Sequence, residues 1–161
     1  MSTRGTIIIT ENEVKYANAK KSKTLLNRIC ECEDIRYIYN HYDSYDLADI
    51  FKEIAKTKSF KYYSANNFSF GVQTNVLVQL VNHYESKKAD WDNLELNLHG
   101  VCIVEWYNVD SEYIVWIDLF NREIKVYETS WSFEPEWEID CLKLVETIEI
   151  PVEHISPFKD W

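Results

Sequence analysis

Apolar residues follow two different periods along the chain, and each period predicts its own kind of element. A β-branched run at 6–10 and a clean alternation of apolar and polar residues at 35–41 are typical of strands. Asn121 and Arg122 predict a compact hairpin turn between two later strands. Further strands are predicted over 101–107, 112–119, 123–128 and 142–150.

Helical spacing is found in two longer stretches. Apolar residues at 47, 50, 51 and 54 lie on one stripe, and Asp46 is the expected N-cap. A second stripe runs from Val76 to Tyr84, with Thr74 as its expected cap. A brief helix is expected over 25–29. Together these elements predict a single α+β domain over 1–161, with a mainly antiparallel sheet and two helices packed on one face.

Composition limits the kind of protein. The chain has 161 residues with 46% hydrophobic content, enough for one domain with its own core. No apolar run reaches the length of a membrane span, and the apolar stretch near the N-terminus is too short for a signal peptide. The four cysteines are too sparse for a disulfide framework and predict reduced thiols. These features predict a cytoplasmic protein.

The charge is distributed unevenly. Residues 1–100 carry thirteen basic and thirteen acidic side chains, whereas 101–161 carry four basic and fourteen acidic ones. The net charge of -10 therefore falls entirely in the last third of the chain. Nucleic-acid binding requires clustered Lys and Arg, so direct binding of nucleic acid is not expected. An acidic surface favours a basic partner.

The stretch WSFEPEWEID at 131–140 concentrates this charge between aromatic rings. Such a mixture suits a partner rich in Arg and Lys, because rings give cation–π contact and carboxylates give charge complementarity. The alternative is a loop whose tryptophans anchor to the core while its acids face water. The candidate binding residues are Trp131, Glu134, Glu136, Trp137, Glu138 and Asp140.

A second candidate site is the stretch YNHYDSYD at 39–46. Side chains two apart on a strand share a face, so Tyr37, Tyr39 and His41 are expected to point the same way. With Asp43 orienting it, His41 would act as a general acid/base or as a ligand contact. The alternative is a strand-to-helix corner in which the tyrosines pack on a helix and the aspartates cap the turn.

The opening Ser2-Thr3-Arg4-Gly5 and the later Tyr39–Tyr45 stretch resemble a loose group of small phage and prophage proteins. That group opens Met-x-Thr-Arg-small and carries Tyr-x-His-x-Asp-Gly-Tyr-Pro before a helix. Ser44 and Asp46 stand where the group has Gly and Pro, so a tight glycine turn is not expected here. The resemblance implies a mobile-element accessory protein and carries over Arg4, His41 and Asp43, with Tyr39 and Tyr45 beside them.

A zinc site is a weaker alternative. Its ligands would be Cys30, Cys32, His99 and Cys102. Structural zinc knuckles usually separate paired cysteines by two residues, whereas one residue separates this pair, and Cys102 lies in an apolar strand pattern. No metal or other cofactor is expected.

These observations favour a binding protein over an enzyme, because the common nucleotide-, dinucleotide-, zinc- and hydrolase motifs are absent from the sequence. The leading hypothesis is a phage accessory protein that inhibits a basic, nucleic-acid-binding defence protein in the host cytoplasm, as an anti-CRISPR or nuclease inhibitor that mimics DNA. The alternative is a nucleotide-signal-binding protein or a phosphodiester-processing enzyme that uses Arg4, His41 and Asp43. The six tryptophans and eleven tyrosines also leave room for a homodimer interface.

Overall fold

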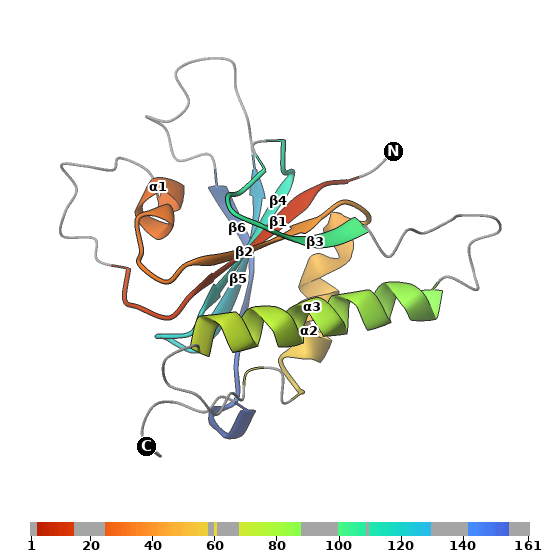
Figure 1. Ribbon diagram of the computed structural model, residues 1–161. Helices are drawn as coiled ribbons and strands as arrows, with labels where there is room; N and C mark the ends of the chain where they lie inside the picture. Colours follow the sequence, from red (N-terminus) through yellow and green to blue (C-terminus); the bar gives the residue numbers. More distant parts are fainter. Residues whose placement is uncertain are drawn as a thin grey trace.

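A computed structural model of the chain places six strands in one sheet, in the order β3-β2-β1-β4-β5-β6 (Figure 1). The strands are β1 (Gly5–Thr10), β2 (Arg36–Asn40), β3 (Val101–Val104), β4 (Tyr113–Asp118), β5 (Glu123–Thr129) and β6 (Leu142–Glu149). The helices are α1 (Leu25–Cys30), α2 (Leu47–Ile54) and α3 (Phe68–Lys87). The structure describes residues 3–14, 25–57, 60, 68–87, 100–108, 110–129 and 142–154.

Strand β1 lies inside the sheet and is buried along its whole length. It pairs with β2 in antiparallel fashion and with β4 in parallel fashion, while the other neighbouring pairs are antiparallel. The β-branched run therefore reflects a strand that is covered on both faces. Ile7 and Ile9 pack on one side of the sheet, and Ile8 packs on the other.

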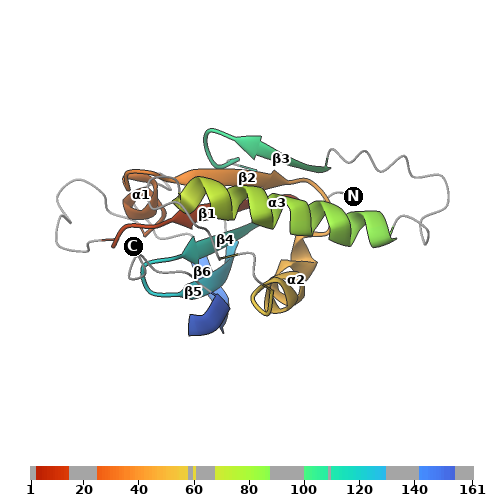
Figure 2. The same ribbon diagram turned by 60° about the horizontal axis from the view of Figure 1, so that its bottom comes forward.

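Helices cover both faces of the sheet. The larger core joins α2 and α3 to Ile7, Ile9 and the neighbouring strands, and Figure 2 shows α3 crossing β1 and β2 with α2 beside it. On the opposite face Leu26 and Ile29 of α1 pack with Ile8 and Trp116. The expected α+β class with two helices on one face is confirmed, and the short α1 supplies the second layer. No helix in the described ranges is long and apolar enough to cross a membrane.

The predicted cap at Thr74 is wrong, whereas the one at Asp46 is confirmed in position but lacks the capping hydrogen bond. Helix α3 begins at Phe68, and the Thr74 hydroxyl donates to the Phe70 carbonyl within it. The group at the start of α3 is the Glu11 carboxylate, which accepts hydrogen bonds from the backbone and side chain of Ser69, while burial raises the pKa of Glu11. Asp46 stands at the N-cap position of α2 without a side-chain capping bond. The cap of α3 thus comes from the loop after β1, and local sequence could not indicate it.

The connection from β3 to β4 crosses the sheet. Strand β3 runs in the same direction as β1, because the two strands are separated by two antiparallel pairings through β2. Strand β4 also runs in this direction, because it pairs with β1 in parallel. The chain must therefore pass over β2 and β1 to begin β4. Residues 105–108 and 110–112, the crossover segment, do so on the α1 face. There the Trp106 ring lies 5.8 Å from that of Tyr37, and the Asn108 amide donates to the Thr6 hydroxyl at 3.1 Å.

The turn between β4 and β5 confirms the expected hairpin at Asn121 and Arg122. Arg122 has a φ of 56°, in the left-handed region. The buried Asp118 carboxylate holds the turn by accepting the Asn121 backbone amide at 3.2 Å and its side-chain amide at 2.8 Å. Burial raises the pKa of Asp118, and the two hydrogen bonds from Asn121 partly oppose this shift.

The raised pKa of Asp118 predicts a defined pH dependence of folding. Between the ordinary value of 3.8 and the folded-state value, the folded protein keeps a proton that the unfolded chain has released. The free energy of unfolding should therefore fall as pH rises through that window and then level off. Asp118→Asn removes this contribution. Urea unfolding of both proteins across the window should show the wild type losing stability relative to the variant, and parallel profiles would contradict the prediction.

Candidate functional site

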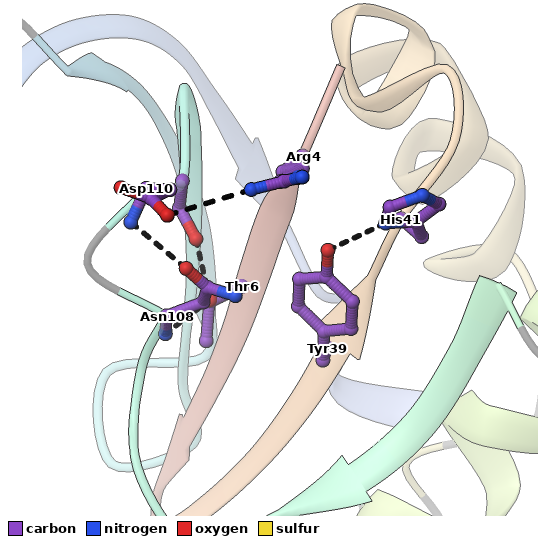
Figure 3. A network of polar contacts seen from close by, with 7 residues as sticks. Arg4, Thr6, Tyr39, His41, Asn108 and Asp110 are labelled. Atoms are coloured by element: carbon purple, nitrogen blue, oxygen red, sulfur yellow. Dashed lines mark hydrogen bonds and ion pairs between the residues drawn. The ribbon is translucent and has the colours of Figure 1, made fainter. Parts of the chain in front are cut away.

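Polar side chains gather on the α1 face where β1 begins and β2 ends. Tyr39 lies opposite Thr6 in the β1–β2 ladder, and His41 follows two residues later on the same face, as expected. Figure 3 shows Arg4 and His41 on either side of the Tyr39 hydroxyl, with Arg4 turned toward Asp110. These four residues are called the Arg4–His41 cluster: Arg4, Tyr39, His41 and Asp110.

The imidazole of His41 is fixed on several sides. Its Nδ1 lies 2.6 Å from the Tyr39 hydroxyl, and its ring meets that of Tyr42 edge-on at 4.7 Å. Its backbone amide donates to the Gly100 carbonyl at 2.6 Å. Burial raises the pKa of Tyr39, and the positive charge of Arg4 opposes that shift, so the phenol remains protonated at neutral pH. When this phenol donates to Nδ1, Nε2 carries the ring proton and becomes a hydrogen-bond donor.

The expected orientation of His41 by Asp43 is wrong. Strand β2 ends at Asn40, and Asp43 has a left-handed backbone with a φ of 52°. Its carboxylate accepts the Tyr45 hydroxyl at 3.1 Å. The period-two pattern stops with the strand, so Asp43 does not continue the face of His41. Asp43 and Tyr45 form a separate exposed pair, and Tyr39 occupies the position expected for a carboxylate.

Arg4 keeps most of its hydrogen-bonding capacity. One terminal nitrogen lies 3.4 Å from Oδ2 of Asp110, and both side chains are partly exposed. The Arg4 carbonyl accepts the backbone amides of Glu112 at 2.8 Å and Tyr113 at 3.3 Å, which fixes the base of its side chain. A guanidinium has five N–H donors, and within the described ranges the Arg4 side chain has one hydrogen-bond partner, Asp110.

Three hydrogen bonds of the crossover segment position Asp110, and the one between Thr6 and Ser111 is buried. The Thr6 and Ser111 hydroxyls, both fully buried, lie 2.7 Å apart. The Asp110 amide donates to Oδ1 of Asn108 at 2.8 Å, and the Asn108 amide donates to Thr6. These residues lie about a hundred positions from Thr6 in the chain, and sequence reasoning missed them. The only local signal is the Asn-x-Asp-Ser pattern at 108–111, which is typical of turns.

The other predicted sites have different outcomes. The six residues proposed within 131–140 lie outside the described residues, as does His99 of the zinc alternative. Within the described ranges, no three His, Cys, Asp or Glu side chains gather as metal ligands. Cys30 is half-buried at the end of α1, and burial raises its pKa to about 11, so its thiol stays protonated at neutral pH. Cys102 is exposed on β3, opposite Tyr39.

No protein-family model, curated protein or solved structure matches this chain. The resemblance to phage-borne proteins therefore stays a prediction. The chemistry of the Arg4–His41 cluster has to be interpreted from its own residues.

The bond between Thr6 and Ser111 predicts a measurable coupling between β1 and the crossover segment. In a double-mutant cycle of Thr6→Val and Ser111→Ala, the coupling energy from urea unfolding should be about 1 kcal/mol, because both hydroxyls are buried. Thr6→Val combined with Lys143→Ala, which lies on exposed β6, serves as the matched control and should be additive. Additive behaviour of the Thr6 and Ser111 variants would contradict the anchoring role.

Proposed function

We propose that this protein binds a nucleotide, with its phosphate held between the guanidinium of Arg4 and the free nitrogen of His41. The observation that carries the proposal is the hydrogen bond between Tyr39 and His41. With Tyr39 as the donor in this bond, Nε2 carries the ring proton and is a donor on the same face as a partly exposed guanidinium. Charge-assisted donors of this kind are the usual partners of phosphate oxygens.

The cluster favours binding over catalysis. The hydroxyl of Tyr39 is engaged with His41, and the carboxylate of Asp110 is paired with Arg4. Within the described ranges, Asp43 makes its contact with Tyr45 and so does not activate His41. A nucleophile with an adjacent base is the usual requirement for phosphoryl or acyl transfer, and this arrangement supports donors alone.

An aromatic surface on the same sheet face as the cluster supports a nucleotide over a bare phosphate ion. Trp106 is 52% exposed and packs against Tyr37, which shares the sheet face of Tyr39 and His41. Its ring also lies 5.1 Å from that of Tyr107. An exposed indole gives a nucleobase a stacking surface, worth about 1–3 kcal/mol per base in other proteins.

Titration calorimetry with AMP, and with inorganic phosphate for comparison, tests this function. Arg4→Gln should weaken AMP binding by about tenfold or more, because a charge-assisted hydrogen bond contributes about 1.5–3 kcal/mol. Tyr39→Phe keeps the ring but removes the hydroxyl, and it should weaken AMP binding less than Arg4→Gln does. Trp106→Ala should weaken the binding of AMP and leave that of phosphate unchanged.

Lys143→Gln is the matched control, because it removes one positive charge from exposed β6. It should bind AMP like the wild type. Equal AMP affinity of the wild type and Arg4→Gln would contradict the proposal, and so would a wild type that binds neither AMP nor phosphate.

The charge distribution favours a second candidate function. The last third of the chain carries the whole net charge of -10, which supports an inhibitor that occupies the nucleic-acid surface of a basic defence protein in the host cytoplasm. In this proposal Trp131 and Trp137 anchor the partner, and the acids at 134, 136, 138 and 140 stand in for phosphates.

Exchange of those four acids tests the second candidate. With Glu134, Glu136 and Glu138 changed to Gln and Asp140 to Asn, a basic host protein captured at low salt should no longer be retained. Capture by the wild type should also fall steeply as salt rises, because exposed charge pairs are screened. Capture that is independent of salt, or equal for wild type and variant, would contradict the mimicry.

A further inference from the structure

The two edges of the sheet differ in how they are protected. Natural proteins usually shield an exposed edge with charged side chains, prolines or bulges. Strand β6 has such features, namely Lys143, Glu146 and Glu149 together with a register shift against β5. Strand β3 reads Val-Cys-Ile-Val, with no charge and no proline. Its side chain at Ile103 is 50% exposed.

The hydrogen-bond pattern shows which backbone groups of β3 face outward. The His41 amide donates to the Gly100 carbonyl, so these two residues form a hydrogen-bonded pair of the β2–β3 ladder. Such pairs alternate along an antiparallel ladder, so Cys102 bonds to Tyr39. The amide and carbonyl groups of Val101 and Ile103 therefore point away from β2. Within the described ranges β3 ends the sheet, and no strand pairs with these groups.

This edge is complementary to a second copy of itself. If two β3 strands meet in antiparallel orientation with Cys102 at the centre, Val101 of each copy pairs with the partner's Ile103. Both pairs can then form the hydrogen bonds that their outward groups offer. The apolar pairs lie on the α3 face, the two Cys102 side chains meet on the α1 face, and no like charges are opposed.

We propose that β3 is the interface of a homodimer, in which the two sheets join edge to edge through Val101–Val104 about a two-fold axis at Cys102. An axis perpendicular to the sheet preserves its faces. Both Arg4–His41 clusters therefore lie on the same side of the joined sheet. The dimer follows from the edge of β3 alone and does not depend on which ligand the cluster binds.

Sedimentation velocity under reducing conditions tests the interface. The wild type should sediment with twice the 19.2 kDa mass of the chain. Ile103→Lys should shift it to the monomer, because a charged residue at this position blocks strand pairing. The matched control is Val145→Lys on β6, where the side chain is 48% exposed, and it should remain dimeric. Circular dichroism identifies an Ile103→Lys protein that has not folded, and Ile103→Thr, whose polar side chain weakens the apolar pairs, then takes its place.

A monomeric wild type at the highest attainable concentration would overturn the proposal, and so would a folded Ile103 variant that remains fully dimeric. The register is tested separately in a Cys141→Ser background, by oxidation with copper phenanthroline and oxygen. The paired Cys102 thiols lose two electrons and two protons to this oxidant and form a disulfide. Directly opposed Cα atoms in such a pair lie about 4.5 Å apart, which a disulfide can span. Cys102→Ser should abolish the cross-link, and a dimer that never cross-links through Cys102 would overturn the register.

Discussion

The burial of β1 on both faces is the constraint from which the rest of the architecture follows. A strand without a solvent-facing side needs a neighbour on each edge and a layer of helix or loop on each face. Strands β2 and β4 supply the neighbours, and α2 and α3 cover one face. The other face is covered by α1 and by the crossover segment, which has to pass over β1 because β4 runs parallel to it. The polar cluster is a consequence of that crossing.

The crossing of the crossover segment over β1 places a buried polar contact beside a partly exposed one. Where the crossover segment touches β1, Thr6 and Ser111 are fully buried and satisfy one another, which fixes the backbone around Asp110. At the margin of this contact, Arg4 and His41 are only partly buried. The buried bond between Thr6 and Ser111 thus anchors the crossover segment beside the partly exposed cluster. The combination of paired, buried hydroxyls with partly exposed polar side chains beside them favours a binding role for the cluster.

In the stretch at 39–46, side chains on one face of the sheet make structural contacts, and side chains on the other face form a polar surface. Asn40 points to the α3 face, where its side-chain amide donates to the Tyr42 carbonyl and to the Ser44 hydroxyl, each at 2.8 Å. Tyr84 of α3 donates to the same Tyr42 carbonyl at 2.9 Å. A Cβ atom at Gly5 would lie 2.7 Å from the Ser44 hydroxyl, so the corner and β1 fit closely without a side chain there. The corner is therefore a structural joint on one face and a polar surface on the other.

Local periodicity by itself determined the strands, the apolar stripe of α2 and the shared face of Tyr39 and His41, because these depend on backbone geometry over a few residues. It could not determine the partners of those residues. Asp110 approaches Arg4 only because β4 pairs in parallel with β1, and Glu11 reaches α3 only because the loop after β1 ends beside that helix. Asp43 does not orient His41 as expected, because β2 ends at Asn40 and the alternation of side chains between the faces ends with it. Contacts between residues far apart in the chain are decided by strand order and burial, and only the tertiary structure contains that information.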